Sequence, residues 1–166
     1  MKQLLLFLTF LFSLNVFAQN LTLSEVLAIR KMELGNADDY LMKKGWQFIS
    51  AEETEDGYNT ATYAYKKSTY DDTANSFFYY SYKNYSNMKV VSVQIHTNEK
   101  FNNYINQIKA WGGKMITSYI EDGDVVKIYK GSSMSYFVKT TTQTNSFEAT
   151  VSTYLIRVYA NEDLEQ

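Results

Sequence analysis

The apolar residues of this chain change twice from a helical spacing to an alternating one. The first change falls at Trp46 and the second at Lys114, and each is followed by segments that alternate with the period of two typical of half-buried strands. This pattern predicts an α+β fold of two tandem repeats, each with one or more helices followed by a four-stranded antiparallel sheet. Helices are expected on one sheet face, with repeats at residues 19–97 and 98–166 forming one compact unit.

Helix ends are marked by capping residues and glycines. Thr22 and Glu25 form a capping-box pattern, which predicts a helix that runs to about Leu34 and stops at Gly35. A second short helix is predicted from a cap at Asn36 to Gly45. The third helix is predicted from a cap at Asn98 to the stop at Gly112-Gly113, because Phe101, Ile105, Ile108 and Trp111 follow helical spacing.

Turn residues separate the predicted strands. Asp56-Gly57 and Asp122-Gly123 lie between alternating segments, which is a strong hairpin signal because both turn positions tolerate positive φ. The last strand changes the parity of its apolar residues near Thr153, so a β-bulge is expected there. The predicted strands begin near Trp46 and then cover residues 58–66, 77–82, 88–96, 114–120, 125–130, 134–140 and 147–159.

Residues 1–18 have the pattern of a secretory signal peptide. Lys2 precedes an apolar run from Leu4 to Leu14, and the small residues around Phe17 fit cleavage before Gln19. The run is shorter than the roughly 20 residues of a membrane span. The sequence therefore predicts an exported protein, periplasmic or extracellular, with no transmembrane segment after cleavage.

The residue composition restricts the chemistry that the chain can perform. It has no cysteine, which excludes disulfides, thiolate nucleophiles and zinc–thiolate sites, and it has one histidine, His96. A formal net charge of −2 provides no basic footprint for a phosphate backbone, so nucleic-acid binding is not expected. No catalytic residue set, no cofactor and no metal site are predicted.

Aromatic residues are concentrated between Tyr58 and Tyr85. In the segment 77–82, alternation places Phe77 and Tyr79 on one face and Phe78 and Tyr80 on the other, so some rings lie away from the helices. Tyrosine mixed with Ser and Asn is a composition typical of binding surfaces, although tyrosines also line core edges with their hydroxyls in water. The candidate ligand or partner surface comprises Tyr63, Tyr65, Tyr70, Tyr79, Tyr80, Tyr82 and Tyr85.

Two other features have a functional and a structural interpretation. His96, at a strand end, is either a base near a serine or a loop-end imidazole in water. The acidic clusters Glu52-Glu53-Glu55-Asp56 and Glu121-Asp122-Asp124 are either carboxylates for a cation or for glycoside hydrolysis, or solvated hairpin tips. The structural interpretation is favoured for both, because no local motif indicates a triad or an EF-hand loop.

These observations favour a non-enzymatic binding module that presents a tyrosine-rich sheet surface to an envelope or secreted protein. The alternatives are a carbohydrate-recognition module, in which tyrosine rings stack on sugars, and a hydrolase that uses only carboxylates. No motif in the sequence identifies a family.

Overall fold

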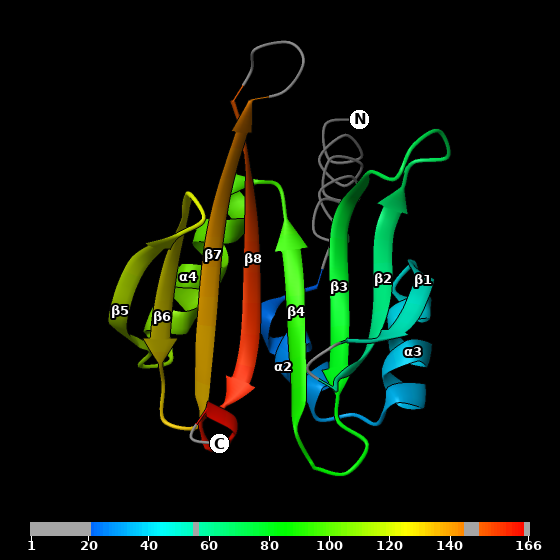
Figure 1. Cartoon of the computed structure of the whole chain (residues 1–166), viewed down its shortest axis with the longest axis horizontal. Coiled ribbons are helices and arrows are strands. Elements are labelled where there is room, and N and C mark those ends of the chain that lie inside the picture. Colours follow the sequence, from blue (N-terminus) through cyan, green and yellow to red (C-terminus); the bar gives the residue numbers. More distant parts are fainter. Residues whose placement is uncertain (1–20, 55–56, 145–149, 165–166) are drawn as a thin grey trace, which may run out of the picture.

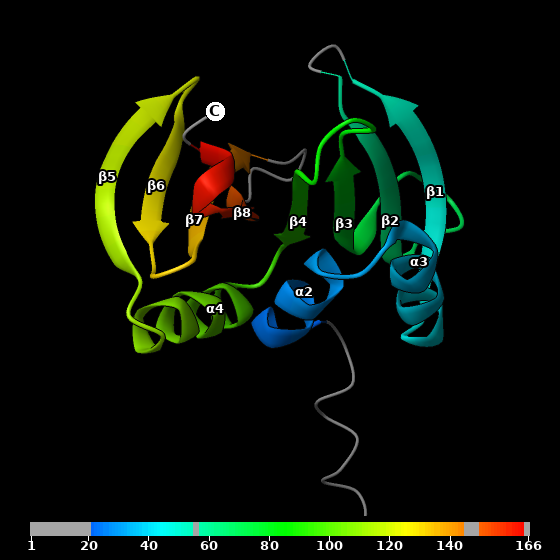
Figure 2. The same cartoon turned by 90° about the horizontal axis from the view of Figure 1, so that it is seen from below.

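The structure is a computed structural model that describes residues 21–54, 57–144 and 150–164. In these described residues, three α-helices lie on one face of one antiparallel sheet of eight strands (Figures 1 and 2). The helices are α2 (Leu23–Arg30), α3 (Leu34–Lys43) and α4 (Asn98–Ala110), and a 3-10 turn, η2 (Asn161–Leu164), follows the last strand. The strands are β1 (Trp46–Glu53), β2 (Asn59–Lys67), β3 (Ala74–Tyr82), β4 (Lys89–Ile95), β5 (Lys114–Glu121), β6 (Asp124–Lys130), β7 (Met134–Thr144) and β8 (Thr150–Ala160).

The strand order is β1-β2-β3-β4-β8-β7-β6-β5. The α+β class with helices packed against an antiparallel sheet is confirmed, but the prediction of two four-stranded sheets is wrong. Strand β4 pairs with β8, with Val91 opposite Val158 and Ile95 opposite Tyr154, and this pairing joins all eight strands. The division at residues 97 and 98 as a boundary between repeats stays a prediction.

The hydrophobic core lies between the helices and the sheet. From the helices, Val26, Leu41 and Ile108 are completely buried, and they meet alternate residues of the central strands such as Phe78 and Ile156. The predicted alternation in β3 is confirmed, because Phe78 and Tyr80 lie in this core while Phe77 and Tyr79 face the other side. The opposite sheet face therefore has no helix over it among the described residues.

The first helix begins with the predicted capping box. The Glu25 backbone N–H donates to the Thr22 hydroxyl at 3.2 Å, and the Glu25 carboxylate accepts from the Thr22 backbone N–H at 2.7 Å. The predicted stop at Gly35 and cap at Asn36 are wrong, since α2 ends at Arg30 and both residues lie in the first turn of α3, whose N-cap is Glu33. Asn98 is the first helical residue of α4, and Thr97 is its N-cap.

The β-bulges do not lie where the parity of the apolar residues in the last strand predicted one. Strands β7 and β8 pair in one unbroken register from Met134–Ala160 to Thr144–Thr150, so the bulge expected near Thr153 is absent there. The first residues of β8 are exposed, and without burial their parity is not constrained. Register shifts occur instead between Phe48 and Ser50 in β1 and between Met115 and Thr117 in β5.

Apart from Gly35, the hairpin and helix-end glycines behave as predicted where they are described. Asp122 and Gly123 have φ of 51° and 86°, which is the two-residue turn that their sequence indicates. Gly45 and Gly112 have positive φ after α3 and α4. Asp56 and the predicted signal peptide, residues 1–18, lie outside the described residues.

The capping box gives the fold an expected acid dependence. Burial raises the pKa of Glu25, but hydrogen bonds from Lys44, Thr22 and Tyr40 outweigh this and lower it to about 2. A carboxyl whose folded pKa lies below its unfolded value contributes stability above pH 4.5, and this contribution is lost as the pH falls toward 2. We expect Glu25→Gln to remove about 1 kcal/mol of this solvent-screened contribution, measured by urea unfolding at pH 7 and at pH 2.5. A variant that loses the same stability at both values would contradict this explanation.

Candidate functional site

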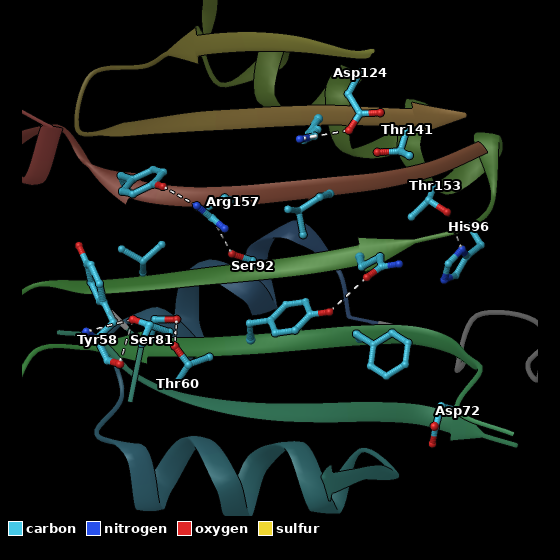
Figure 3. A pocket seen from close by; sticks show the side chains of 18 of the residues that line it. Tyr58, Thr60, Asp72, Ser81, Ser92, His96, Asp124, Thr141, Thr153 and Arg157 are labelled. Atoms are coloured by element: carbon cyan, nitrogen blue, oxygen red, sulfur yellow. Dashed lines mark hydrogen bonds and ion pairs between the residues drawn. The ribbon is translucent and has the colours of Figure 1, made fainter. Parts of the chain in front are cut away.

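A groove of about 900 Å³ crosses the sheet face opposite the helices. Its lining comes from β2, β3, β4, β8, β7 and β6, which are six neighbours in the sheet, and from the segments beside them (Figure 3). The lining combines hydroxyls, aromatic rings, two amides and a few charges. Its central residues are Phe77, Tyr79, Ser81, Ser92, Gln94, Leu155, Arg157 and Tyr159.

Arg157 lies in the middle of this groove. It belongs to a row of cross-strand partners that runs from Tyr79 through Ser92 to Arg157. Its Nε donates to the Ser92 hydroxyl at 3.3 Å and its Nη1 to the Tyr159 hydroxyl at 3.2 Å (Figure 3). No described carboxylate forms an ion pair with this half-buried guanidinium. It is therefore a positioned cation with donor capacity for an anionic group.

The second cationic side chain in the lining, Lys139, already has acidic partners. Its Nζ lies 3.1 Å from Asp124 and 3.5 Å from Glu121. A hydrogen bond from Thr141, followed by one from Lys139, lowers the pKa of Asp124, and the hydrogen bond to Asp124 raises the pKa of Lys139. Lys139 and Asp124 are thus both charged and paired with each other at neutral pH. Of the two cationic side chains Lys139 and Arg157, it is Arg157 whose positive charge has no carboxylate partner among the described residues.

Two aromatic rings stand next to each other on β3. The rings of Phe77 and Tyr79 have centroids 6.5 Å apart and planes inclined by 24°. The Tyr79 hydroxyl donates to the Gln94 side-chain oxygen at 3.2 Å, and burial raises the pKa of Tyr79. The planes of the two rings are thus nearly parallel, and the pair is a neutral aromatic platform beside the Arg157 row.

His96 is at one end of the groove. Its Nδ1 lies 3.2 Å from the Thr153 hydroxyl, and its Nε2 is buried without a partner among the described residues (Figure 3). Burial lowers the pKa of His96, which keeps the ring neutral at physiological pH. No carboxylate orients this ring within the described part of the chain, so the catalytic interpretation has no triad geometry behind it.

The seven predicted tyrosines are distributed over four environments. Tyr63 and Tyr80 are 1% exposed and Tyr65 is 8% exposed, so these three pack in the core and present no surface to a partner. Their rings lie on the helix-covered face of the sheet, where they bury a large apolar area against the helices. Tyr82 is half-buried against the core, and Tyr70 and Tyr85 are fully exposed on the loops at either end of β3. Of the seven, Tyr79 alone lines the groove.

Sequence reasoning missed Tyr58, Arg157 and Tyr159 as groove residues. The sequence does contain a pattern that indicates Arg157 and Tyr159. They alternate with the apolar Ile156 and Val158 and therefore lie on the sheet face opposite the core. Their proximity to Tyr79 has no local signal, because it depends on the pairing of β4 with β8.

The two acidic clusters lie at opposite edges of the sheet. Glu52 and Glu53 end β1, and Glu121 to Asp124 form the β5–β6 turn, while Glu55 and Asp56 lie outside the described residues. Strands 4.7–4.9 Å apart put these edges roughly 30 Å from each other, so the described carboxylates of one cluster do not pair with those of the other. Within the described residues, no group of three or more His, Asp or Glu side chains has a metal-binding arrangement.

Comparison with known proteins gives no relative. No family model matches the chain, and no curated protein or solved structure matches it. Among the described residues no helix has the length and apolar character needed to cross a membrane.

Proposed function

We propose that the protein is a non-enzymatic binding module that holds a protein partner in the groove of its open sheet face. The observation that carries this proposal is the uncompensated guanidinium of Arg157 in the middle of that groove. Arginine and tyrosine are the residue types that contribute most often to the binding energy of protein interfaces. Arg157, Tyr79 and Tyr159 supply both types at the centre of the groove.

The width of the groove supports a macromolecular partner. Its lining extends from β2 to β6, which is five strand spacings or roughly 24 Å. A helix with its side chains is about 10–12 Å across. A loop or helix of a partner therefore fits between the outer strands, with an acidic side chain directed at Arg157.

The test is capture of a partner from envelope extract by tagged wild-type and variant proteins. Arg157→Met and Tyr79→Ser each change one side chain at the centre of the groove, and we expect either to reduce the affinity for the captured partner by about 30-fold or more. Tyr70→Ser is the matched control, because Tyr70 is exposed on the loop between β2 and β3. Equal capture by wild type, Arg157→Met and Tyr79→Ser would remove the groove as the binding surface.

A carbohydrate ligand is the second candidate, and the Phe77–Tyr79 platform is the observation that favours it. Aromatic rings stack on sugar faces, and the neighbouring Gln94, Ser92 and Ser81 side chains offer hydrogen bonds to hydroxyls. On a glycan array, Phe77→Ala should then abolish binding while Arg157→Met retains it. In the capture experiment, loss of the partner by Arg157→Met and its retention by Phe77→Ala support a protein partner.

Export is part of the proposal. The support is the signal-peptide pattern of residues 1–18, and a binding module for envelope or secreted proteins must reach that compartment. We expect protein purified from cells to begin at Gln19, as measured by intact mass and N-terminal sequencing. A chain that still begins at Met1 would contradict cleavage.

A further inference from the structure

We propose that the protein forms a twofold-symmetric dimer in which β5 pairs antiparallel with β5 of a second copy. Strand β5 is the last strand in the sheet order, so the backbone groups on its outer side have no strand partner within the described residues. An unpaired edge of this kind is a template for another strand.

The β5 edge also exposes large apolar side chains. Met115 is 55%, Ile116 58% and Ile120 76% exposed, and Val125 in the paired strand β6 is 43% exposed. Contiguous apolar surface is uncommon on the exterior of a monomer and marks contact surfaces. Both the backbone and the side chains of this edge are therefore without the cover that a partner strand would provide.

The pairing of β5 with β6 shows which side chains share a face. Met115 lies opposite Tyr129 and Ile120 opposite Val125, which places them with Ser118 on the helix side of the sheet. Glu121 lies opposite Asp124 and Lys114 opposite Lys130, on the groove side. The register shift between Met115 and Thr117 leaves Ile116 as the extra residue of a bulge.

With a twofold axis at Ser118, the sequence of β5 is complementary to itself. Ser118 then meets Ser118 of the second copy, and Thr117 meets Tyr119. Beyond the bulge, Met115 meets Ile120, an apolar pair on the helix side, and each pair joins residues of the same face. Lys114 meets Glu121 on the groove side, so that opposite charges are brought together at both ends.

This complementarity identifies a second copy as the occupant. Lysine and bulges are devices that discourage edge pairing, but in this register each Lys114 meets an acidic residue and the two bulges are related by symmetry. The other edge, β1, ends in Glu52 and Glu53 and contains no cationic residue, so it offers no such match. Because the contact is isologous, the assembly closes at two copies.

Disulfide trapping tests the register directly, because the wild-type chain contains no cysteine. Directly opposite residues of an antiparallel pair have Cα atoms about 4.5–5.5 Å apart, which is within disulfide range. We expect Ser118→Cys to give a covalent dimer on mild oxidation. Thr117→Cys is the matched control, because its two copies lie diagonally, about 7–8 Å apart, and should not cross-link efficiently.

Sedimentation of the purified protein over a concentration range is the second measurement. We expect a dimer for wild type, and at least about a tenfold weaker association for Ile120→Lys, which places a cation against Met115 of the second copy. Ile49→Lys at the β1 edge should leave the dimer intact, and circular dichroism checks that each variant is folded. The proposal is overturned by a wild-type monomer at every concentration up to about 0.1 mM, by equal cross-linking of the two cysteine variants, or by oligomers that grow beyond two copies.

Discussion

Replacing Asp163 with asparagine is expected to destabilise the protein by about 3 kcal/mol, because it leaves a buried guanidinium without its counter-charge. Arg30 Nη2 lies 2.8 Å from Asp163 Oδ2, and the side chains are 11% and 8% exposed. This ion pair joins α2, near the start of the described chain, to η2 after the last strand. For a chain of this length the change corresponds to a fall in Tm of roughly 10 °C, which thermal unfolding measures.

The double variant Arg30→Met/Asp163→Asn separates charge burial from packing. Methionine fills a similar volume without a charge, and the introduced asparagine keeps an oxygen that can accept from the Ala160 backbone N–H, as Asp163 does at 3.3 Å. We expect the double variant to recover most of the stability lost in Asp163→Asn. Equal instability of the two variants would contradict the explanation by an uncompensated guanidinium at Arg30.

Gly113→Ala is expected to destabilise the protein by about 2–3 kcal/mol through steric overlap. Its backbone N–H donates to the Ile108 carbonyl oxygen at 2.9 Å, and that of Gly112 to the Lys109 oxygen at 3.0 Å, which together close α4 as a Schellman motif. A Cβ at residue 113 would lie 2.6 Å from Ile108 Cγ2 and 2.8 Å from the Ile108 carbonyl oxygen. Ile108 is completely buried, so the helix end itself would have to shift.

Gly35→Ala is the matched control for this prediction. Gly35 lies in the first turn of α3, has no positive φ, and a Cβ there would meet nothing within 4 Å. Alanine is favoured over glycine in a helix by up to about 1 kcal/mol, so this variant should be as stable as wild type or more stable. Urea unfolding of both variants compares them, and a loss at Gly35→Ala similar to that at Gly113→Ala would contradict the steric explanation.

Local patterns predicted most elements because each rests on contacts between residues close in sequence. The capping box at Thr22, the glycine that ends α4 and the alternation in β3 are of this kind. The helix stop predicted at Gly35 was wrong because a glycine is also tolerated inside a helix. The bulge predicted near Thr153 was wrong because the first residues of β8 are exposed, so that burial does not constrain their parity.

The joining of the eight strands into one sheet and the set of residues that line the groove could not be predicted from the sequence. Both depend on the pairing of β4 with β8, whose partners Val91 and Val158 are far apart along the chain. The density of tyrosines drew attention to Tyr63, Tyr65 and Tyr80, which the structure places in the core. Alternation separates two faces, but it does not say which face the helices cover.

The position of β8 also governs the order in which the protein can be made. β8 is the last strand along the described chain, yet it lies between β4 and β7 in the interior of the sheet. A nascent chain that has emerged only as far as β7 has the strands β1 to β4 and the strands β5 to β7 with no strand to join them. The eight-stranded sheet can therefore form only after β8 has been synthesised. If the chain is exported as we propose, any part of it that is translocated before β8 has been synthesised is translocated without the complete sheet.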